Sequence, residues 1–182
     1  RDVLGLWVAQ EGVVFADFSE KENVIKDIEN IEIKEYYIGV DWGFEHYGTL
    51  VVIGVDFEDN YYIVEVIAKQ HKYFDYWKML ILQKYKEYQV SRVFCDSART
   101  EYVQGLLDFG INAENAKKDV KEGIDLVGAM YKRNALKITE KAFKGKFEDE
   151  IYSYVWGKND EPVKENDDVM DAIRYVLYSL KK

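Results

Sequence analysis

Three apolar segments follow one another in the first half of the chain with only short polar breaks between them. The first begins at Ile38 (IGVDWG), the second spans Thr49–Val55 (TLVVIGV) and the third spans Tyr61–Ala68 (YYIVEVIA). Strands that are joined by short turns pair antiparallel with their neighbours in the chain, so this stretch predicts a three-stranded meander. The chain must therefore fold around a sheet.

The apolar pattern changes its period after the meander. Apolar residues recur at helical spacing over roughly Asp75–Tyr88, and the short run VFCD (Val93–Asp96) then predicts a fourth strand. A helix between two strands lets the chain return in parallel through a crossover, so we expect VFCD to lie beside the first strand.

Helices and short strands alternate through the rest of the chain. We expect a helix that carries Val103 and stops at Gly110, a weak strand near Ile111–Ala113, a helix from Val120 to Tyr131, a strand at Ala135–Thr139, a helix lined by Phe143, Phe147 and Ile151, and a last helix from about Asp168. Residues before about Ile31 have mixed signals and read as an arm. This order predicts an α/β fold with a mixed sheet flanked by helices.

Length and composition suit one domain with a well-filled core. The 182 residues are 48% hydrophobic and 15% aromatic, which is ample for that purpose. No apolar segment is long enough to cross a bilayer, and no basic-then-apolar leader opens the chain. A single cysteine, Cys95, excludes a disulfide framework and a Cys-rich zinc site, as is typical of a reducing cytoplasm. Because the chain begins at Arg1 rather than Met, we expect a fragment of a longer protein.

The charge balance argues against tight binding of nucleic acid by this chain alone. Its 25 basic and 34 acidic residues give a formal net charge of −9, which repels a polyanion at long range. An acidic domain can still process a polyanion where metal ions and a local basic strip offset its field.

Several acidic residues occupy positions that the expected fold would bring together. Asp41 ends the first strand and Asp96 ends the fourth, and the carboxyl ends of parallel neighbours emerge at the same edge of a sheet. Side chains alternate along a strand, so Gly39 shares the face of Asp41, where we expect it to leave open space. In the motif NDDVMDA, Asp168 and Asp171 share one face of the last helix beside its apolar stripe.

Such a cluster of carboxylates predicts a metal-dependent reaction. Converging carboxylates without nearby Lys or Arg repel one another and raise one another's pKa values. Mg²⁺ and Mn²⁺ prefer oxygen ligands, and two such ions about 3.5–4 Å apart activate water and stabilise a leaving oxygen at phosphorus. The cluster therefore predicts hydrolytic cleavage of phosphodiesters with two bound ions.

Ordinary structural roles are also open to these acidic residues. Asp caps turns and helices, so Asp41 alone reads as structural, and Asp96 stands where it can start the helix that carries Val103. Either Asp167 or Asp168 suits the N-terminus of the last helix, which favours a negative charge. It is the coincidence of all the acidic positions with one fold order that favours the catalytic interpretation.

The basic residues and histidines give weaker signals. His46 and His71 lie on separate loops without ligand-like partners and read as surface residues. The basic residues that follow the fourth strand and the weak strand would hold phosphates if they formed a strip near the acidic cluster, and otherwise are solvated surface. They are Arg99, Lys117, Lys118 and Lys121.

Three motifs in this order resemble one protein family. The motifs IGVDWG, VFCDSAR and EPVKENDDVMDAIRY resemble those of the nuclease domain of large terminase subunits of tailed bacteriophages, over nearly the whole chain. The arm GLWVAQEGVVFADF is similar to the segment that links that family's motor to its nuclease. The resemblance implies a ribonuclease H-like (resolvase-like) domain over residues 31–182, with residues 1–30 as a linker from a missing ATPase motor domain.

The resemblance also implies an activity and a set of roles. The activity is endonucleolytic cleavage of concatemeric viral double-stranded DNA during packaging, with two Mg²⁺ or Mn²⁺ ions. Asp41 corresponds to the first-strand ligand that bridges both ions, Asp96 to the fourth-strand ligand and Asp171 to the ligand of the last helix. Relatives often have His where this chain has Asp168, so Asp168 is a fourth metal ligand, a water-orienting base or only a cap.

The same resemblance implies the partners of the chain. They are double-stranded DNA, the ATPase domain, the small terminase subunit and the capsid portal, in the cytoplasm of the infected bacterial host and with no membrane. No phosphate loop of the form G-x-x-x-x-G-K followed by Ser or Thr occurs in the sequence, so we expect the chain to be the cutting half of a larger protein.

Two other classes of protein fit part of the pattern. The stretch DWGFEHYGT is similar to the phosphate-binding hairpin of actin-like and sugar-kinase-like ATP-binding folds, but the chain is short and has no Gly-Gly pair for an adenosine loop. A non-catalytic docking module with the same fold is the other alternative, and it predicts no dependence on metal.

Overall fold

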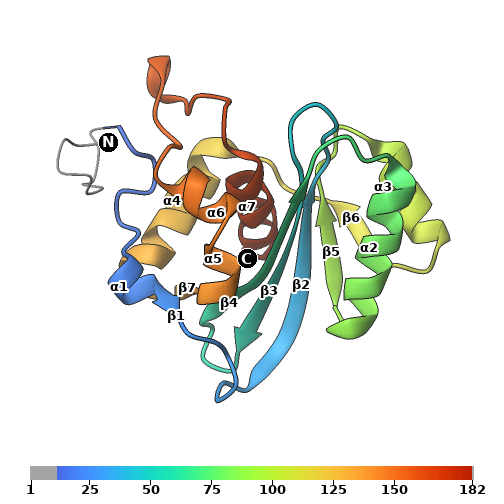
Figure 1. Cartoon of the computed structure of the whole chain (residues 1–182), viewed down its shortest axis with the longest axis horizontal. Coiled ribbons are helices and arrows are strands. Elements are labelled where there is room, and N and C mark those ends of the chain that lie inside the picture. The colour runs from blue at the N-terminus through green and yellow to red at the C-terminus, as the bar shows by residue number, and fades with distance from the viewer. Residues whose placement is uncertain (1–11, 182) are drawn as a thin grey trace.

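The computed structural model describes residues 12–181, in which seven strands form one mixed sheet (Figure 1). The strands lie in the order β1-β7-β4-β3-β2-β5-β6. They are β1 (Val24–Ile25), β2 (Ile33–Asp41), β3 (Gly48–Asp56), β4 (Tyr61–Lys69), β5 (Arg92–Cys95), β6 (Ala113–Asn115) and β7 (Leu136–Thr139). The helices are α1 (Glu20–Asn23), α2 (Phe74–Glu87), α3 (Thr100–Asp108), α4 (Val120–Lys132), α5 (Glu140–Phe143), α6 (Lys146–Ile151), α7 (Asp168–Leu180) and the 3-10 turn η1 (Lys158–Asp160).

The meander and the crossover that the sequence predicts are confirmed. Strands β2, β3 and β4 pair antiparallel in chain order. Helix α2 then carries the chain back, and β5 pairs parallel with β2, so that Cys95 lies opposite Val40. The carboxyl ends of β2 and β5 therefore lie side by side at one edge of the sheet.

The sheet divides the hydrophobic core into two clusters, and helices cover both faces of the sheet (Figure 1). On one face, Ile38 and Val40 of β2 pack with Trp77 of α2 and Leu106 of α3. On the other face, α4, α5, α6 and α7 cover the remaining side chains of the meander. All nine residues of β3 are buried, because helices close both of its faces. No helix among residues 12–181 has both the length and the apolar character needed to cross a membrane.

The segment before β2 also packs against this core. The Phe18 ring contacts the rings of Tyr131 and Phe147, with centroid distances of 5.2 and 5.6 Å. The buried Asn23 amide donates hydrogen bonds to the backbone carbonyls of Tyr131 and Leu136, and β1 pairs with β7. Part of the expected arm therefore contributes to the core of this domain, whereas residues 1–11 of it lie outside the described residues.

Two local predictions are wrong in detail. The helix expected to run through Phe143 and Ile151 is two short helices, α5 and α6, because Gly145 between them has a φ of 107°, a conformation that favours glycine. The weak strand expected near Ile111–Ala113 begins only at Ala113, where its pairing with β5 starts. Neither difference changes the order of the elements.

The expected open space beside Gly39 is also wrong. A Cβ atom at this position would lie 2.4 Å from the carbonyl oxygen of Ala172 and 2.7 Å from a methyl group of Val176. The space above Gly39 is therefore filled by α7, whose backbone lies directly on β2. This close approach brings the first turn of α7 to the end of β2.

We predict that Gly39→Ala destabilises the protein by about 3 kcal/mol, because the helix backbone must move away from the strand. Thermal unfolding should show a Tm lower by roughly 5–10 °C for a chain of this size. Gly128→Ala on α4 is the matched control, because its Cβ atom would meet only the Phe15 ring at 3.9 Å. That variant should be about 0.5–1 kcal/mol more stable than the wild type, and equal melting of the two variants would contradict the packing described.

Candidate active site

Two strand ends and one helix start bring four carboxylates together. Asp41 is the last residue of β2, and Asp96 follows β5 directly. The Asp96 N–H donates to the Val40 carbonyl at 2.9 Å, which continues the pairing of the two strands by one residue. Asp168 and Asp171 enter from the first turn of α7. All four line one cleft of about 1020 Å³.

The charge of Asp41 has no cationic partner. The residue is 5% exposed, and no ion pair in residues 12–181 involves it. Burial raises the pKa of Asp41 well above its ordinary value, and the negative charges of Asp171, Asp96 and Asp168 raise it further. An ionised Asp41 is thus a buried negative charge that no side chain neutralises.

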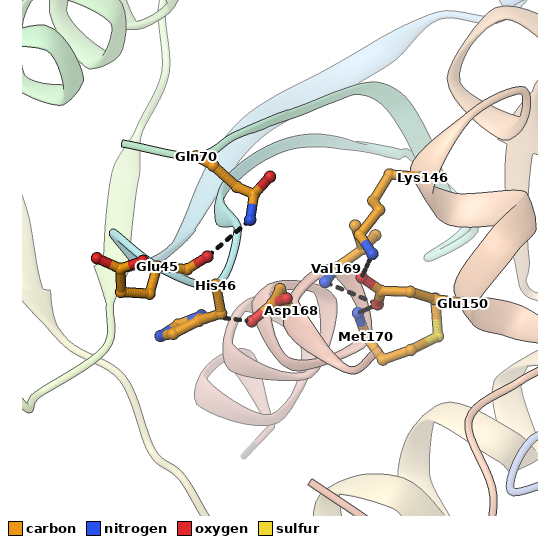
Figure 2. A network of polar contacts seen from close by, with 8 residues as sticks. All are labelled: Glu45, His46, Gln70, Lys146, Glu150, Asp168, Val169 and Met170. Atoms are coloured by element: carbon orange, nitrogen blue, oxygen red, sulfur yellow. Dashed lines mark hydrogen bonds and ion pairs between the residues drawn. The ribbon is translucent and has the colours of Figure 1, made fainter. Parts of the chain in front are cut away.

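Each of the other three carboxylates has its own partner. Lys118 Nζ lies 2.6 Å from Asp96 Oδ1, and Arg174 Nη1 lies 2.8 Å from Asp171 Oδ1. His46 Nδ1 lies 2.8 Å from Asp168 Oδ1 (Figure 2). The contacts of Asp96 and Asp168 thus link the segment after β5 to the segment before α4, and the β2–β3 turn to α7.

The partners change the acidity of these groups to different extents. Burial would raise the pKa of Asp96, but hydrogen bonds from Lys118 and from the Ala98 N–H hold it below its ordinary value. Burial raises the pKa of Asp171 to about 7, although Arg174 opposes that rise. The site therefore contains carboxylates whose environments push their pKa values apart.

The donor set fits a hard divalent cation. Carboxylate oxygens are the ligands that Mg²⁺ and Mn²⁺ prefer, and the uncompensated Asp41 is the charge that such an ion would neutralise. In the described part of the chain, no three side chains of His, Cys, Asp or Glu already stand in a ligand arrangement. Two of the carboxylates, Asp96 and Asp171, are engaged by Lys118 and Arg174. A cation would compete with these two basic side chains for the same oxygens.

A residue distant in the sequence holds the start of α7. Glu150 is fully buried, and its Oε1 accepts hydrogen bonds from the N–H groups of Val169 and Met170 at 2.9 and 3.1 Å (Figure 2). Lys146 Nζ lies 3.7 Å from the other oxygen of Glu150. Asp167 occupies the N-cap position without a side-chain cap bond. The capping role considered for Asp167 or Asp168 is thus performed by Glu150.

Two residues of the site were missed or misread from the sequence. His46 reads as an isolated surface residue, and its side chain is 60% exposed, but the turn after β2 places its ring on Asp168. The Gln70 amide, which donates to the Glu45 carbonyl at 2.7 Å, ties this turn to the end of β4 (Figure 2). The one sequence feature that indicates the contact of His46 with Asp168 is its position in the turn that follows the strand of Asp41. Nothing in the sequence around Glu150 indicates that it accepts hydrogen bonds from the start of α7.

The other histidine, His71, is exposed, as expected, and lies 3.6 Å from Glu45.

The four basic residues singled out from the sequence do not form one strip. Lys118 and Lys121 line the acidic cleft. Arg99 instead lines a neighbouring groove and pairs with Glu101 at 2.6 Å. Lys117 lines neither, and its backbone N–H donates to Ser179. The structure therefore brings two of the four to the carboxylates.

Comparisons with known proteins point to one family. A family model described as the terminase RNaseH-like domain matches residues 38–180. The large terminase subunit of Escherichia phage T5 is 25% identical over 190 residues, which are 94% of this chain and 43% of that protein. The chain thus spans less than half the length of this relative.

Solved structures with the same fold include two large terminases. The large terminase of a thermophilic bacteriophage, solved in complex with ADP, superposes with a TM-score of 0.84 and 24% identity, over 98% of this chain and 47% of that one. The nuclease domain of the large terminase of bacteriophage SPP1, with bound Mn, gives a TM-score of 0.63 and 18% identity, over 85% of this chain and 94% of that one. These likenesses bear out the mixed sheet of the ribonuclease H-like type.

We predict that Glu150→Gln gains stability relative to the wild type as the pH rises from 6 to 9. Burial raises the pKa of Glu150 from 4.5 to about 8, so the folded protein binds this proton more tightly than the unfolded chain does. Wild-type stability therefore falls as pH rises through this interval, whereas the amide does not titrate. The relative gain should be roughly 2–3 kcal/mol, measured by chemical unfolding at both pH values.

The matched control for this prediction is Glu148→Gln on the same helix. Glu148 is exposed, so its variant should follow the wild-type pH profile. Parallel profiles for wild type and Glu150→Gln would show that Glu150 is ionised in the folded protein at pH 6.

Proposed function

We propose a function for this chain from one premise: it belongs to the terminase RNaseH-like domain family, whose model matches residues 38–180. Large terminase nuclease domains are its homologues, and a nuclease role in phage DNA packaging follows from that kinship. The finer proposal is that it is a metal-dependent endonuclease that cuts concatemeric viral double-stranded DNA. The observation that carries it is the convergence of Asp41, Asp96 and Asp171 in one cleft, where Asp41 has no cationic partner.

The carboxylates take the roles of ligands in this proposal. Asp41, Asp96 and Asp171, which line the same cleft, would together hold two Mg²⁺ or Mn²⁺ ions. When bound, such ions activate water and stabilise the leaving oxygen of a phosphodiester. Lys118 and Arg174 pair with Asp96 and Asp171 and would yield carboxylate oxygens to an ion that binds there. The Mn-bound SPP1 nuclease domain supports a divalent ion in this family.

Asp168 is proposed as a fourth group of the site rather than a helix cap. Glu150 already accepts the hydrogen bonds of the helix start, so Asp168 is free to face His46. In this position it either binds a metal ion or orients the attacking water, and His46 holds its carboxylate in place.

Basic residues would hold the DNA near the cleft. Lys118 and Lys121 line the cleft itself and are the best placed to contact phosphates on both sides of the cut. Arg99 and Lys117 would contact the DNA farther out. This local positive charge offsets part of the net charge of −9.

The rest of the packaging machinery is also proposed from the family. The large terminase from the thermophilic bacteriophage binds ADP, and this chain covers 47% of it, which supports an ATPase domain elsewhere in the full protein. Residues 1–30 would then be the linker to that motor, and residues 31–182 the nuclease. The small terminase subunit and the capsid portal would be its partners, in the cytoplasm of the infected bacterium.

A non-catalytic docking module with the same fold is the alternative that an experiment must separate. The family match over residues 38–180 already favours a terminase over an actin-like or sugar-kinase-like ATP-binding fold. A docking module would have no need for a buried, uncompensated carboxylate, and it would be indifferent to divalent ions.

We predict that the purified chain nicks and linearises supercoiled plasmid in Mn²⁺, and that Asp41→Ala, Asp96→Ala and Asp171→Ala each abolish this. Mn²⁺ should serve at least as well as Mg²⁺, because it is less strict about octahedral geometry. Mn²⁺ at about 100 times its Kd should also stabilise the wild type by about 2.7 kcal/mol and leave Asp41→Ala unchanged, measured by thermal unfolding.

The control is Asp75→Ala, which removes a carboxylate that is 90% exposed on α2 and should cut and melt like the wild type. In EDTA at neutral pH, Asp41→Ala should melt no lower than the wild type, since burial raises the folded pKa of Asp41 and the carboxyl group therefore costs folding free energy above its unfolded pKa. If the plasmid stays intact at every Mn²⁺ concentration, the nuclease function is excluded and the non-catalytic docking module remains.

We predict that Asp168→Asn keeps its melting temperature but cuts about tenfold more slowly, with a raised Mn²⁺ requirement. Asn preserves the hydrogen bond to His46 and the size of the side chain, but not the negative charge. Asp168→His should retain substantial activity, because relatives that this chain resembles often have His there. Wild-type cutting by Asp168→Asn at the wild-type Mn²⁺ concentration would exclude Asp168 from the site.

A further inference from the structure

A second groove of about 590 Å³ adjoins the acidic cleft, and its aromatic side chains have no role in the proposed reaction. It lies between the turn after β2 and the first residues of α2 and α3. His46 and Asp96 line both the groove and the cleft. A ligand in the groove would therefore be continuous with a strand that passes over the carboxylates.

Exposed aromatic rings line this groove. Tyr73, at the N-cap of α2, is 75% exposed, and Phe44, in the turn after β2, is 37% exposed. Their ring centroids are 5.0 Å apart. In the same groove, the half-buried rings of Phe74 and Tyr102 stack with centroids 4.4 Å apart, and Trp42 packs edge-on against both. The groove thus offers flat apolar surfaces to solvent beside a rigid aromatic base.

The charge of the groove suits an anionic ligand. Lys72 and Arg99 belong to its lining, and the Arg99 guanidinium lies 4.1 Å from the centre of the Tyr102 ring while pairing with Glu101. Asp96 is the one carboxylate in the lining, and Lys118 neutralises it at 2.6 Å. In a protein with a net charge of −9, this is a locally basic surface.

The helix starts and one buried donor add to this polarity. Helices α2 and α3 begin at the groove without side-chain caps, so their first N–H groups carry partial positive charge. Trp77 also lines the groove, and its buried indole N–H has no acceptor within residues 12–181. The groove therefore contains hydrogen-bond donors and cations together with its aromatic rings.

Aromatic faces interleaved with cations are the surface that single-stranded nucleic acid requires. Unpaired bases stack on such rings, while Lys, Arg and backbone N–H groups contact the phosphates. An intact duplex cannot use the rings, because its bases stack on one another inside the helix. The exposed rings therefore select for nucleotides that have left the duplex.

We propose that this groove binds unpaired nucleotides of the DNA strand that is cut, next to the scissile phosphate. The inference rests on the proposed nuclease function and narrows its substrate: DNA with locally unpaired bases, such as a bubble or a frayed end, binds and is cut in preference to perfect duplex. Phe44 and Tyr73 are the stacking residues, and Lys72 and Arg99 contact the backbone.

The test is binding of two probes to the purified chain in EDTA, where no metal-dependent cutting occurs. One probe is a single-stranded oligodeoxynucleotide that carries 2-aminopurine, and the other is the matching blunt duplex. Phe44→Ala and Tyr73→Ala should each weaken binding of the single strand about tenfold and reduce the quenching of 2-aminopurine, because each removes one stacking surface. Duplex binding should change less than about twofold.

Two variants serve as controls for this experiment. Tyr73→Phe keeps the ring and should bind the single strand like the wild type. Phe57→Ala removes a ring that is 66% exposed in the β3–β4 turn, at the other end of the strands from Asp41, and should change neither probe.

Three results would overturn the inference: no binding of the single strand by the wild type, unchanged single-strand binding by both alanine variants, or equal losses for single strand and duplex. The last would make the groove a general DNA surface. Plasmid cutting by the wild type in Mn²⁺ is measured separately, so failure of the nuclease function and failure of the groove are distinguishable. If both alanine variants bind the single strand like the wild type and the wild type cuts plasmid normally, the nuclease function stands and the proposed preference for unpaired bases is wrong.

Discussion

The close packing of α7 on β2 is the constraint on which the rest of the site depends. Gly39 has no side chain, so the carbonyl oxygen of Ala172 reaches the strand, and the first turn of α7 arrives beside Asp41. Glu150 then fixes the helix start through two backbone N–H groups. The strand supplies one acidic position and the helix two more, and their spacing depends on a contact that a single methyl group would disturb.

This packing places several carboxylates in positions that are largely buried from solvent. Asp41 is left without a cationic partner, while Asp96 and Asp171 are held by Lys118 and Arg174. Such an arrangement costs folding free energy, and costs of this kind are found at sites that bind ions or substrates. The adjoining groove has the opposite character, with aromatic rings and cations. In our proposal, a DNA strand contacts the carboxylates of the cleft on one side and the aromatic rings of the groove on the other.

Much of the fold was predictable because its signals are local. Periodicity located the meander, α2, β5, α4 and α7, and the crossover rule placed β5 beside β2. The break at Gly145 and the late start of β6 were missed, because helical spacing continues across the glycine and the strand is only three residues long. The packing of Phe18 and Asn23 was missed too, since their partners lie more than a hundred residues away.

From β2 onward, the sequence by itself determined the order of the main strands and helices and which acidic residues lie at one edge of the sheet, because strand ends and helix faces follow from spacing along the chain. Only the tertiary structure decided what each carboxylate touches. His46 reaches Asp168, Lys118 reaches Asp96 and Glu150 caps α7 through contacts between segments that are 19 to 122 residues apart. Side-chain partners over such separations depend on how helices pack on the sheet, and periodicity carries no information about them.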